Sequence, residues 1–352
     1  MTLVADTRRP GDPLVAGSRP IRSVLATPGV PAPLPFGRWL LGSPLYALTL
    51  GRGSPKSFFA VAPDPWPGDA VVGLRLMVGE LMAHGQVGPV APQSDDPPWR
   101  RAAAGTLWLD GLNGFGWLRD LRDCGDPGAA ALAVRLIDDW SDCEWRWSPL
   151  SWKREVMAAR MVNWIRHYDW LATAADQGFP GRFVLSLARQ RAHLRRVMRS
   201  ALVGHEAVAV LKAMIFADIA FLRDGKRFEK SLEHNLGRLA KFVKRYVGHD
   251  GVVAERAPHL QVAVLRHLLD VRAALGSAER RAPAELIAAV DRMAPMLRFF
   301  RHGDGGLALF NGSWEGERSL MDLVLARSGR PSPRRRWPCK AVSSGSPPAR
   351  RW

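Results

Sequence analysis

The chain has few of the features that define several common protein classes. Its 352 residues include only three cysteines, Cys124, Cys143 and Cys339, which are widely spaced and form no CxxC pair. This pattern argues against a disulfide framework and against a structural zinc site. No run of about 18 uninterrupted apolar residues occurs, so no membrane span is predicted. The first twenty residues have no apolar stretch after their charges and do not resemble a secretory signal.

Motifs for nucleotide, metal and hydrolase sites are also missing. No GxGxxG, P-loop, HExxH or GxSxG is present, and no nucleic-acid module such as a zinc finger is visible. The nine histidines have no ligand spacing, which argues against a dedicated metal site. No cofactor is predicted. With no signal peptide apparent, the sequence alone favours a cytoplasmic protein.

Acidic residues are scarce relative to basic ones, and the formal net charge is +17. Such an excess is typical of proteins that bind nucleic acid, acidic polysaccharide or an anionic surface. Residues 328–352 hold seven Arg and Lys and no acidic residue, so +10 belongs to residues 1–327. We interpret 328–352 as a basic, disordered tail, 1–65 as an irregular arm rich in Pro and Gly, and 66–327 as the folded domain.

Hydrophobic periodicity predicts helices through most of that domain. The expected ranges are about 68–85, 114–125, 126–142, 152–172, 182–202, 205–223, 227–247, 257–275, 283–301 and 316–327. Two to ten residues separate most of these helices, and such short links favour antiparallel hairpins packed in series. Strand signals are confined to "GVVAE" (251–255) and "GLALF" (306–310).

Those two strand-like pieces share a context. "RYVGHDGVVAER" and "FFRHGDGGLALFN" each follow a helix and carry a His, then Asp-Gly, then an apolar run. Asp-Gly is a strong turn signal because Gly accepts positive φ. The two stretches are either equivalent loops that bring His249, Asp250, His302 and Asp304 to one face, or simple helix ends.

Tryptophan is abundant. Nine of the fourteen Trp residues lie between Trp99 and Trp170. They either fill the core with their N–H groups satisfied or provide aromatic platforms on which sugar rings stack.

Two further stretches carry candidate chemistry. His205 follows Gly204 at a predicted helix start, where the helix dipole disfavours the imidazolium and suits a neutral base or hydrogen-bond donor. In "AERAPHLQ", Arg256 can form a planar fork to a carboxylate and His259 can act as a general base. A surface His205, a Glu255–Arg256 surface pair and a solvated His259 are the alternatives.

Taken together, these stretches resemble the N-terminal α/α-toroid of the heparinase II/III-type polysaccharide lyases. The resemblance covers roughly residues 63–325. It is carried by the order and spacing of "PDPWPGDAVVGLRLMVGE", "LNGFGWLRDLRDCGDPGAA", "MVNWIRHYDWL", "LVGHEAVAVLKAMIFADIAF", "DGVVAERAPHLQVAVLRHLLDVRAAL" and "DRMAPMLRFFRHGDGGLALFNGS". It implies an all-α fold, an incomplete α/α toroid of antiparallel helical hairpins.

The resemblance also implies β-elimination on acidic, uronate-containing polysaccharides in the cell envelope, with general acid–base catalysis and electrostatic stabilisation. In this chain His205 would contact the uronate carboxylate or act as base, Arg256 would neutralise the carboxylate, and His259 would replace the family's tyrosine. Substrate binding would fall to Trp108, Trp117, Glu255, His302, Asp304 and Asn311.

The chain departs from the family pattern at important places. Gly204-His205 stands where active members often have Asn-His, and none of the three tyrosines lies near Pro258-His259. The family's C-terminal β-sheet domain is expected to be missing, so the chain alone is expected to be weak or inactive. A non-catalytic protein that binds acidic glycan or assembles envelope polysaccharide is the main alternative. A third hypothesis is a nucleic-acid binder that uses the basic tail. It is not the favoured one, so no nucleic-acid partner is expected.

Overall fold

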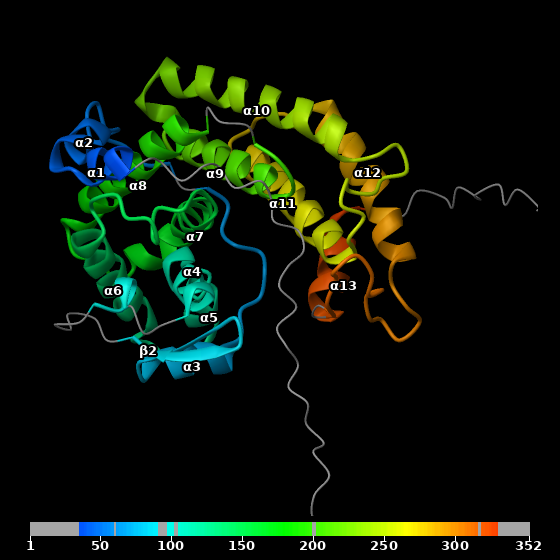
Figure 1. Ribbon diagram of the computed structural model, residues 1–352, viewed down its shortest axis with the longest axis horizontal. Coiled ribbons are helices and arrows are strands. Elements are labelled where there is room, and N and C mark those ends of the chain that lie inside the picture. The colour runs from blue at the N-terminus through cyan, green and yellow to red at the C-terminus, as the bar shows by residue number, and fades with distance from the viewer. Residues whose placement is uncertain are drawn as a thin grey trace, which may run out of the picture.

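The computed structural model of the chain describes residues 35–59, 61–90, 97–101, 105–198, 202–315 and 318–329. Helical hairpins follow one another around an open arc in this part of the chain (Figure 1). The helices are α1 (Pro35–Gly42), α2 (Pro44–Leu50), α3 (Ala70–Met77), α4 (Thr106–Gly114), α5 (Leu118–Asp123), α6 (Ala129–Cys143), α7 (Arg154–Ala172), α8 (Phe179–Val197), α9 (Glu206–Ala220), α10 (Lys226–Tyr246), α11 (Pro258–Ser277), α12 (Ala284–Phe299) and α13 (Arg318–Arg327). The expected all-α, incomplete toroid is confirmed.

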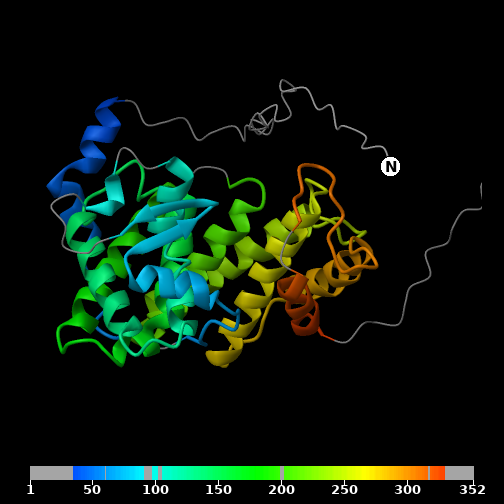
Figure 2. The same cartoon turned by 90° about the horizontal axis from the view of Figure 1, so that it is seen from below.

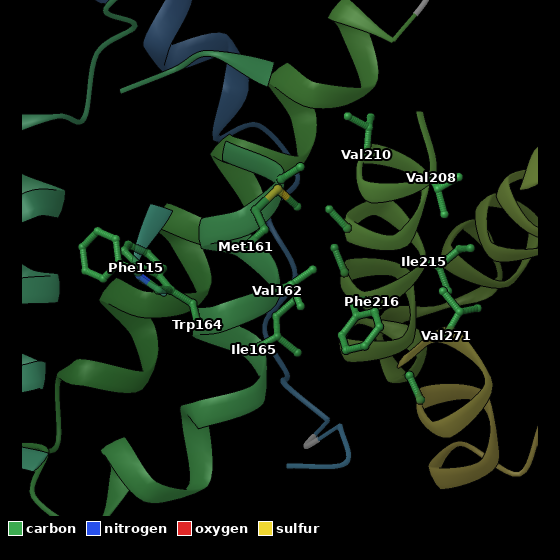
Figure 3. Packing of buried hydrophobic residues seen from close by; sticks show 14 of the residues in the cluster. Phe115, Met161, Val162, Trp164, Ile165, Val208, Val210, Ile215, Phe216 and Val271 are labelled. Atoms are coloured by element: carbon green, nitrogen blue, oxygen red, sulfur yellow. The ribbon is translucent and has the colours of Figure 1, made fainter. Parts of the chain in front are cut away.

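Helix α9 lies at the centre of the packing. It contacts α7, α8, α10 and α11, and nearly all of its side chains are buried. Its sequence, "AVAVLKAMIFADIA", places apolar residues on all sides of the helix. Such a helix is stable only when neighbouring helices surround it. Met161 and Ile165 of α7 lie opposite Phe216 of α9 in the core (Figure 3). None of the described helices has the length and apolar character needed to cross a bilayer.

One predicted helix ends early and is followed by a hairpin. Helix α3 stops at Met77, and β1 (Glu80–Ala83) pairs in antiparallel register with β2 (Gln86–Pro89). The turn residues His84 and Gly85 have φ of 50° and 74°. Positive φ at both central residues is the geometry of a tight hairpin turn. The prediction of a helix as far as residue 85 was therefore wrong. The edge of β2 faces solvent, as Figure 2 shows for the cyan strands.

The two predicted strands are shorter than expected. "GVVAE" contributes only the bridge between Val247 and Val253, and "GLALF" only the bridge between Arg301 and Leu307. Each bridge closes a turn directly after a helix, α10 or α12. Both stretches therefore close the ends of hairpins rather than form a sheet.

The predicted irregular arm contains ordered structure. Helices α1 and α2 lie within it, and the segment that follows enters the core, where Val61, Asp64 and Trp66 are buried. The chain thus packs continuously across the expected boundary between residues 65 and 66. The first 34 residues of the arm, and all of the predicted tail beyond residue 329, lie outside the described residues.

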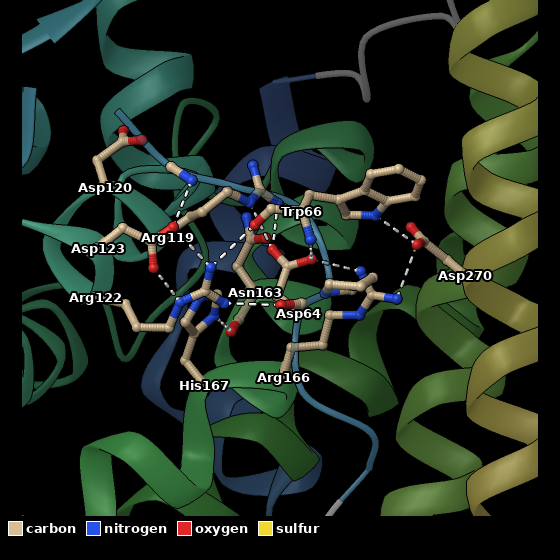
Figure 4. A network of polar contacts seen from close by, with 12 residues as sticks. Asp64, Trp66, Arg119, Asp120, Arg122, Asp123, Asn163, Arg166, His167 and Asp270 are labelled. Atoms are coloured by element: carbon tan, nitrogen blue, oxygen red, sulfur yellow. Dashed lines mark hydrogen bonds and ion pairs between the residues drawn. The ribbon is translucent and has the colours of Figure 1, made fainter. Parts of the chain in front are cut away.

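A buried charge network joins this N-terminal segment to the inner helices. Asp64 accepts hydrogen bonds from Arg119 of α5 at 2.7 Å and from Arg166 of α7 at 3.0 Å. Figure 4 shows the extended segment that carries Asp64 and Trp66 passing between α7 and α11. Arg166 also reaches Asp270 of α11, with 2.8 Å between Nη2 and Oδ1. Four segments of the chain, the N-terminal segment, α5, α7 and α11, therefore share one set of ionic contacts.

Asp270 is the second carboxylate of the network, and it also has three partner residues. Besides Arg166, it accepts from Trp66 Nε1 at 2.8 Å and from Lys212 Nζ of α9 at 3.0 Å. Burial alone would raise the pKa of Asp270, but Lys212 and Arg166 outweigh it and hold that pKa well below its usual range. Burial lowers the pKa of Lys212 to about 8 despite its ionic partner. Asp270 is thus a buried anion that several donors keep ionised.

We expect the Asp270→Asn variant to lose about 3–5 kcal/mol of unfolding free energy, because it leaves Lys212 buried without a counter-charge and removes one of the two carboxylates that pair with Arg166. Urea denaturation followed by circular dichroism measures the loss. Asp322→Asn is the matched control, since Asp322 pairs with Arg301 at the surface and such pairs contribute about 1 kcal/mol or less. Equal stability of the two variants would contradict the structural role of Asp270.

Candidate functional site

His205 stands at the entry of α9, on one side of a polar cluster. Gly204 before it has φ of 63°, a left-handed conformation that a glycine adopts without strain. The ring is half-buried. Burial lowers the pKa of His205, and Glu255 and Glu155 only partly offset that effect. His205 is therefore mainly a neutral imidazole at neutral pH.

Glu255 lies beside this turn and is held by a tyrosine from another helix. Its Oε1 is 3.2 Å from the place where a Cβ on Gly204 would lie. Its Oε2 accepts a hydrogen bond of 2.5 Å from the phenol of Tyr246, the last residue of α10. Burial and Glu255 both raise the pKa of Tyr246 strongly. The phenol consequently stays protonated and acts as a donor.

His259 lies in the first turn of α11, within reach of the charge on His205. Its Nδ1 is hydrogen-bonded to Ser313 Oγ at 3.1 Å, and its backbone N–H donates to the same oxygen at 3.3 Å. The ring centroid of Trp314 is 3.9 Å from that of His259. Burial lowers the pKa of His259, His205 lowers it further, and Glu255 raises it. The two imidazoles therefore share one carboxylate neighbour.

Arg256 and Asn311 connect the two loops that the sequence paired. Asn311 Nδ2 donates to the backbone oxygen of Arg256 at 2.9 Å. Both residues have positive φ, 51° for Arg256 and 50° for Asn311. Asparagine tolerates this conformation better than arginine does, so the bond helps to hold the strained Arg256. The Arg256 side chain is largely exposed and pairs with Asp250 at 3.2 Å.

A carboxylate pair completes the cluster on the α7 side. Burial raises the pKa of Glu206, and Glu155 raises it further through its charge and a hydrogen bond. Arg154 Nε lies 2.9 Å from Glu155 Oε1, and Arg154 Nη2 lies 3.8 Å from Glu206 Oε2. The two carboxyl groups thus have Arg154 as a common neighbouring cation.

Four of the expected substrate-binding residues make contacts within the protein, and ligand binding by the exposed His302 and Asp304 stays a prediction. Trp108 and Trp117 are buried, and their Nε1 atoms donate to the backbone oxygens of Leu81 and Leu112, so neither presents a ring to a sugar. His302 donates its backbone N–H to Gly306, and Asp304 Oδ1 accepts from the Gly306 N–H at 2.8 Å, which shapes their own turn.

The remaining predicted residues are brought together. His205, Glu255, Arg256, His259 and Asn311 come from α9, from the loop after α10, from α11 and from the loop after α12. The arrangement offers two neutral imidazoles, a carboxylate held by a phenol, and an exposed guanidinium. These groups suit proton transfer next to a bound anion. Among the described residues, no three His, Cys, Asp or Glu side chains are placed to hold a metal ion.

Sequence reasoning missed Tyr246, Ser313, Trp314 and Glu155. Tyr246 lies nine residues before Glu255, and no motif links the two, because the end of α10 and the following turn bring them together. Trp314 carried a weak signal, a lone tryptophan directly after "NGS".

Comparison with known proteins agrees with this geometry at the level of the fold. No family model matches the chain. The crystal structure of heparinase III superposes with a TM-score of 0.57 over 68% of this chain and 40% of that one, at 15% identity. The heparan sulfate lyase HepC from Pedobacter heparinus gives 0.52 over 74% and 44%, at 18% identity. The chain has the heparinase-like helical toroid.

A relative with higher identity carries a different name. FtsZ-localized protein C from Caulobacter vibrioides (strain NA1000 / CB15N) is 32% identical over 272 residues, which make up 77% of this chain and 46% of that protein. The chain therefore spans about half the length of the proteins that it matches.

We expect Glu255→Gln to lower the pKa of both His205 and His259, because the Glu255 charge stabilises each imidazolium. Titration of the histidine ring protons by NMR measures both values. Asp304→Asn is the control, since Asp304 belongs to a separate turn. Unchanged His205 and His259 titrations in Glu255→Gln would show that the three groups are not close in solution.

Proposed function

We propose that the chain is a polysaccharide lyase-like protein that acts on an acidic, uronate-containing glycan at the His205–His259 pair. The observation that carries the proposal is this pair, with Glu255 beside Gly204 and acting on the charge of both rings, in a heparinase-like toroid. β-Elimination removes the C5 proton of the uronate and breaks the bond from C4 to the glycosidic oxygen. A double bond forms between C4 and C5, and the leaving oxygen takes a proton.

His259 is the proposed base. Its neutral imidazole takes the C5 proton and, once protonated, gives it to the leaving oxygen, so one residue replaces the tyrosine that the resemblance leads one to expect. Burial keeps the imidazole neutral before reaction and makes the imidazolium acidic afterwards. The hydrogen bond between Nδ1 of His259 and Oγ of Ser313 orients the ring.

The other groups stabilise charge on the substrate carboxylate. In the proposal, His205 donates an N–H to the carboxylate, and the exposed Arg256 approaches it from the loop. Tyr246 and Glu255 position these groups rather than react, because the phenol is buried against the carboxylate.

We expect the wild-type chain to produce the ultraviolet absorbance of an unsaturated uronate from at least one acidic polysaccharide. His259→Ala should lower the rate by about 10²–10⁴-fold, as loss of a general base does. The acid limb of kcat/KM should lie below the ordinary histidine pKa of about 6.5, because burial lowers the pKa of His205 and His259. His234→Ala, on the exposed side of α10, is the control. A rate insensitive to His259→Ala would refute the assignment of the base.

A second candidate is a non-catalytic glycan-binding protein that localises with FtsZ. It is favoured by the 32% identity to FtsZ-localized protein C, which exceeds the 15–18% identity to the lyase structures. The phenol of Tyr246 is already hydrogen-bonded to Glu255 and is not free to act as base, which points the same way.

For this second candidate, we expect a fluorescent fusion of the chain to coincide with labelled FtsZ in Caulobacter vibrioides cells. The His205→Ala/His259→Ala double variant should localise equally well, because the relative's name refers to position and not to catalysis. A uniform signal for the wild-type fusion would count against the candidate.

A further inference from the structure

An exposed aromatic ring adjoins the proposed base. Trp314 is 62% exposed, although its centroid lies only 3.9 Å from that of His259. Leu309 and Phe310 of the same loop are also exposed, at 61% and 42%. Trp108 and Trp117 are buried with their N–H groups hydrogen-bonded to the backbone, whereas Trp314 offers an open face at the site. An aromatic face of this kind suits the apolar C–H side of a sugar ring.

Four arginines of the segments that frame the site already have carboxylate partners. Arg154 pairs with Glu155, and Arg256 pairs with Asp250. Arg301 pairs with Asp322, and Arg318 with Asp304 and Glu315. A ligand with many charges would have to break these pairs before it gained new ones.

Carboxylates also line the site itself. Glu255 and Glu155 both act on His205, and Glu206 lies against Glu155. A sulfate group placed here would meet these anions, and like charges in one site repel strongly. Part of the basic excess lies at the start of α10, at the opposite end of that helix from Tyr246, where Lys226, Arg227 and Lys230 are exposed.

We propose that the site takes an unsulfated glycan with no more than one carboxylate per disaccharide, and that one of its sugar rings stacks on Trp314. The inference rests on one part of the proposed function, that a glycan binds at this site. It does not require that the chain cleave the glycan. Affinity would come from stacking on Trp314 and a single carboxylate contact, and Glu155, Glu206 and Glu255 would discriminate against sulfated chains.

The test uses two probes with the same sugar backbone, an unsulfated chondroitin hexasaccharide and its sulfated counterpart. Isothermal titration calorimetry with the full chain is done at about 0.3 M salt, where charges on the outer surface are largely screened. We expect the unsulfated probe to bind at least tenfold more tightly than the sulfated one. Trp314→Ala should weaken binding of the unsulfated probe about tenfold, equivalent to about 1.4 kcal/mol. Trp314→Phe should retain most of the affinity, and Trp39→Ala, which removes another exposed tryptophan, should have no effect.

Three results would overturn the inference. The first is that the sulfated probe binds as tightly as the unsulfated one and loses the same affinity in Trp314→Ala. The second is equal binding by the wild type and a folded Trp314→Ala variant, and the third is that neither probe shows binding that depends on Trp314. Circular dichroism establishes that the variants are folded. Trp314-dependent binding of the unsulfated probe without any unsaturated product would refute the lyase proposal but uphold this one.

Discussion

The ionic contacts of Asp270 are the constraint on which the arrangement of the toroid depends. This carboxylate holds Arg166 of α7, Lys212 of α9 and Trp66 of the N-terminal segment at once. Buried ions tolerate little displacement, because each lost contact leaves a charge unsolvated. The network thereby fixes the direction of α9 and α11, and both helices present their N-terminal ends, with His205 and His259, to the same side of the molecule.

The candidate site therefore depends on the helices behind it more than on its own contacts. His205 and His259 start two helices that pack along their length, so their separation follows from the packing of α9 on α11. The loops after α10 and α12 then close over the helix ends, joined by Asn311 and the backbone of Arg256. A toroid built from hairpins brings one loop from each hairpin to the same rim. Residues far apart in sequence, such as His205 and Ser313, thus contribute to one cluster.

The helices with a sustained apolar period were predictable from the sequence, whereas the β1–β2 hairpin and the tertiary contacts of the site were not. The helices from α6 to α12 were predicted because their apolar spacing is sustained over three turns or more, and their ends carry Gly or Pro. The β1–β2 hairpin was missed because "GELMAHG" continues the helical period and has one buried position, Leu81. In the site, His205, Arg256 and His259 stood out by residue type at helix starts. The link between Tyr246 and Glu255 is tertiary, and the sequence left open whether Trp108 and Trp117 fill the core or face a ligand.

The hydrogen bond between Tyr246 and Glu255 has a consequence for how a ligand would be received. It ties the last residue of α10 to the loop that carries Arg256, and burial of the phenol makes the bond costly to break. The rim of the site is thereby fixed before any ligand arrives. Binding then requires little ordering of the protein, so more of the contact energy is retained as affinity. A site of this kind selects ligands by fit to an existing surface, and it would lose that selectivity if the loop were freed.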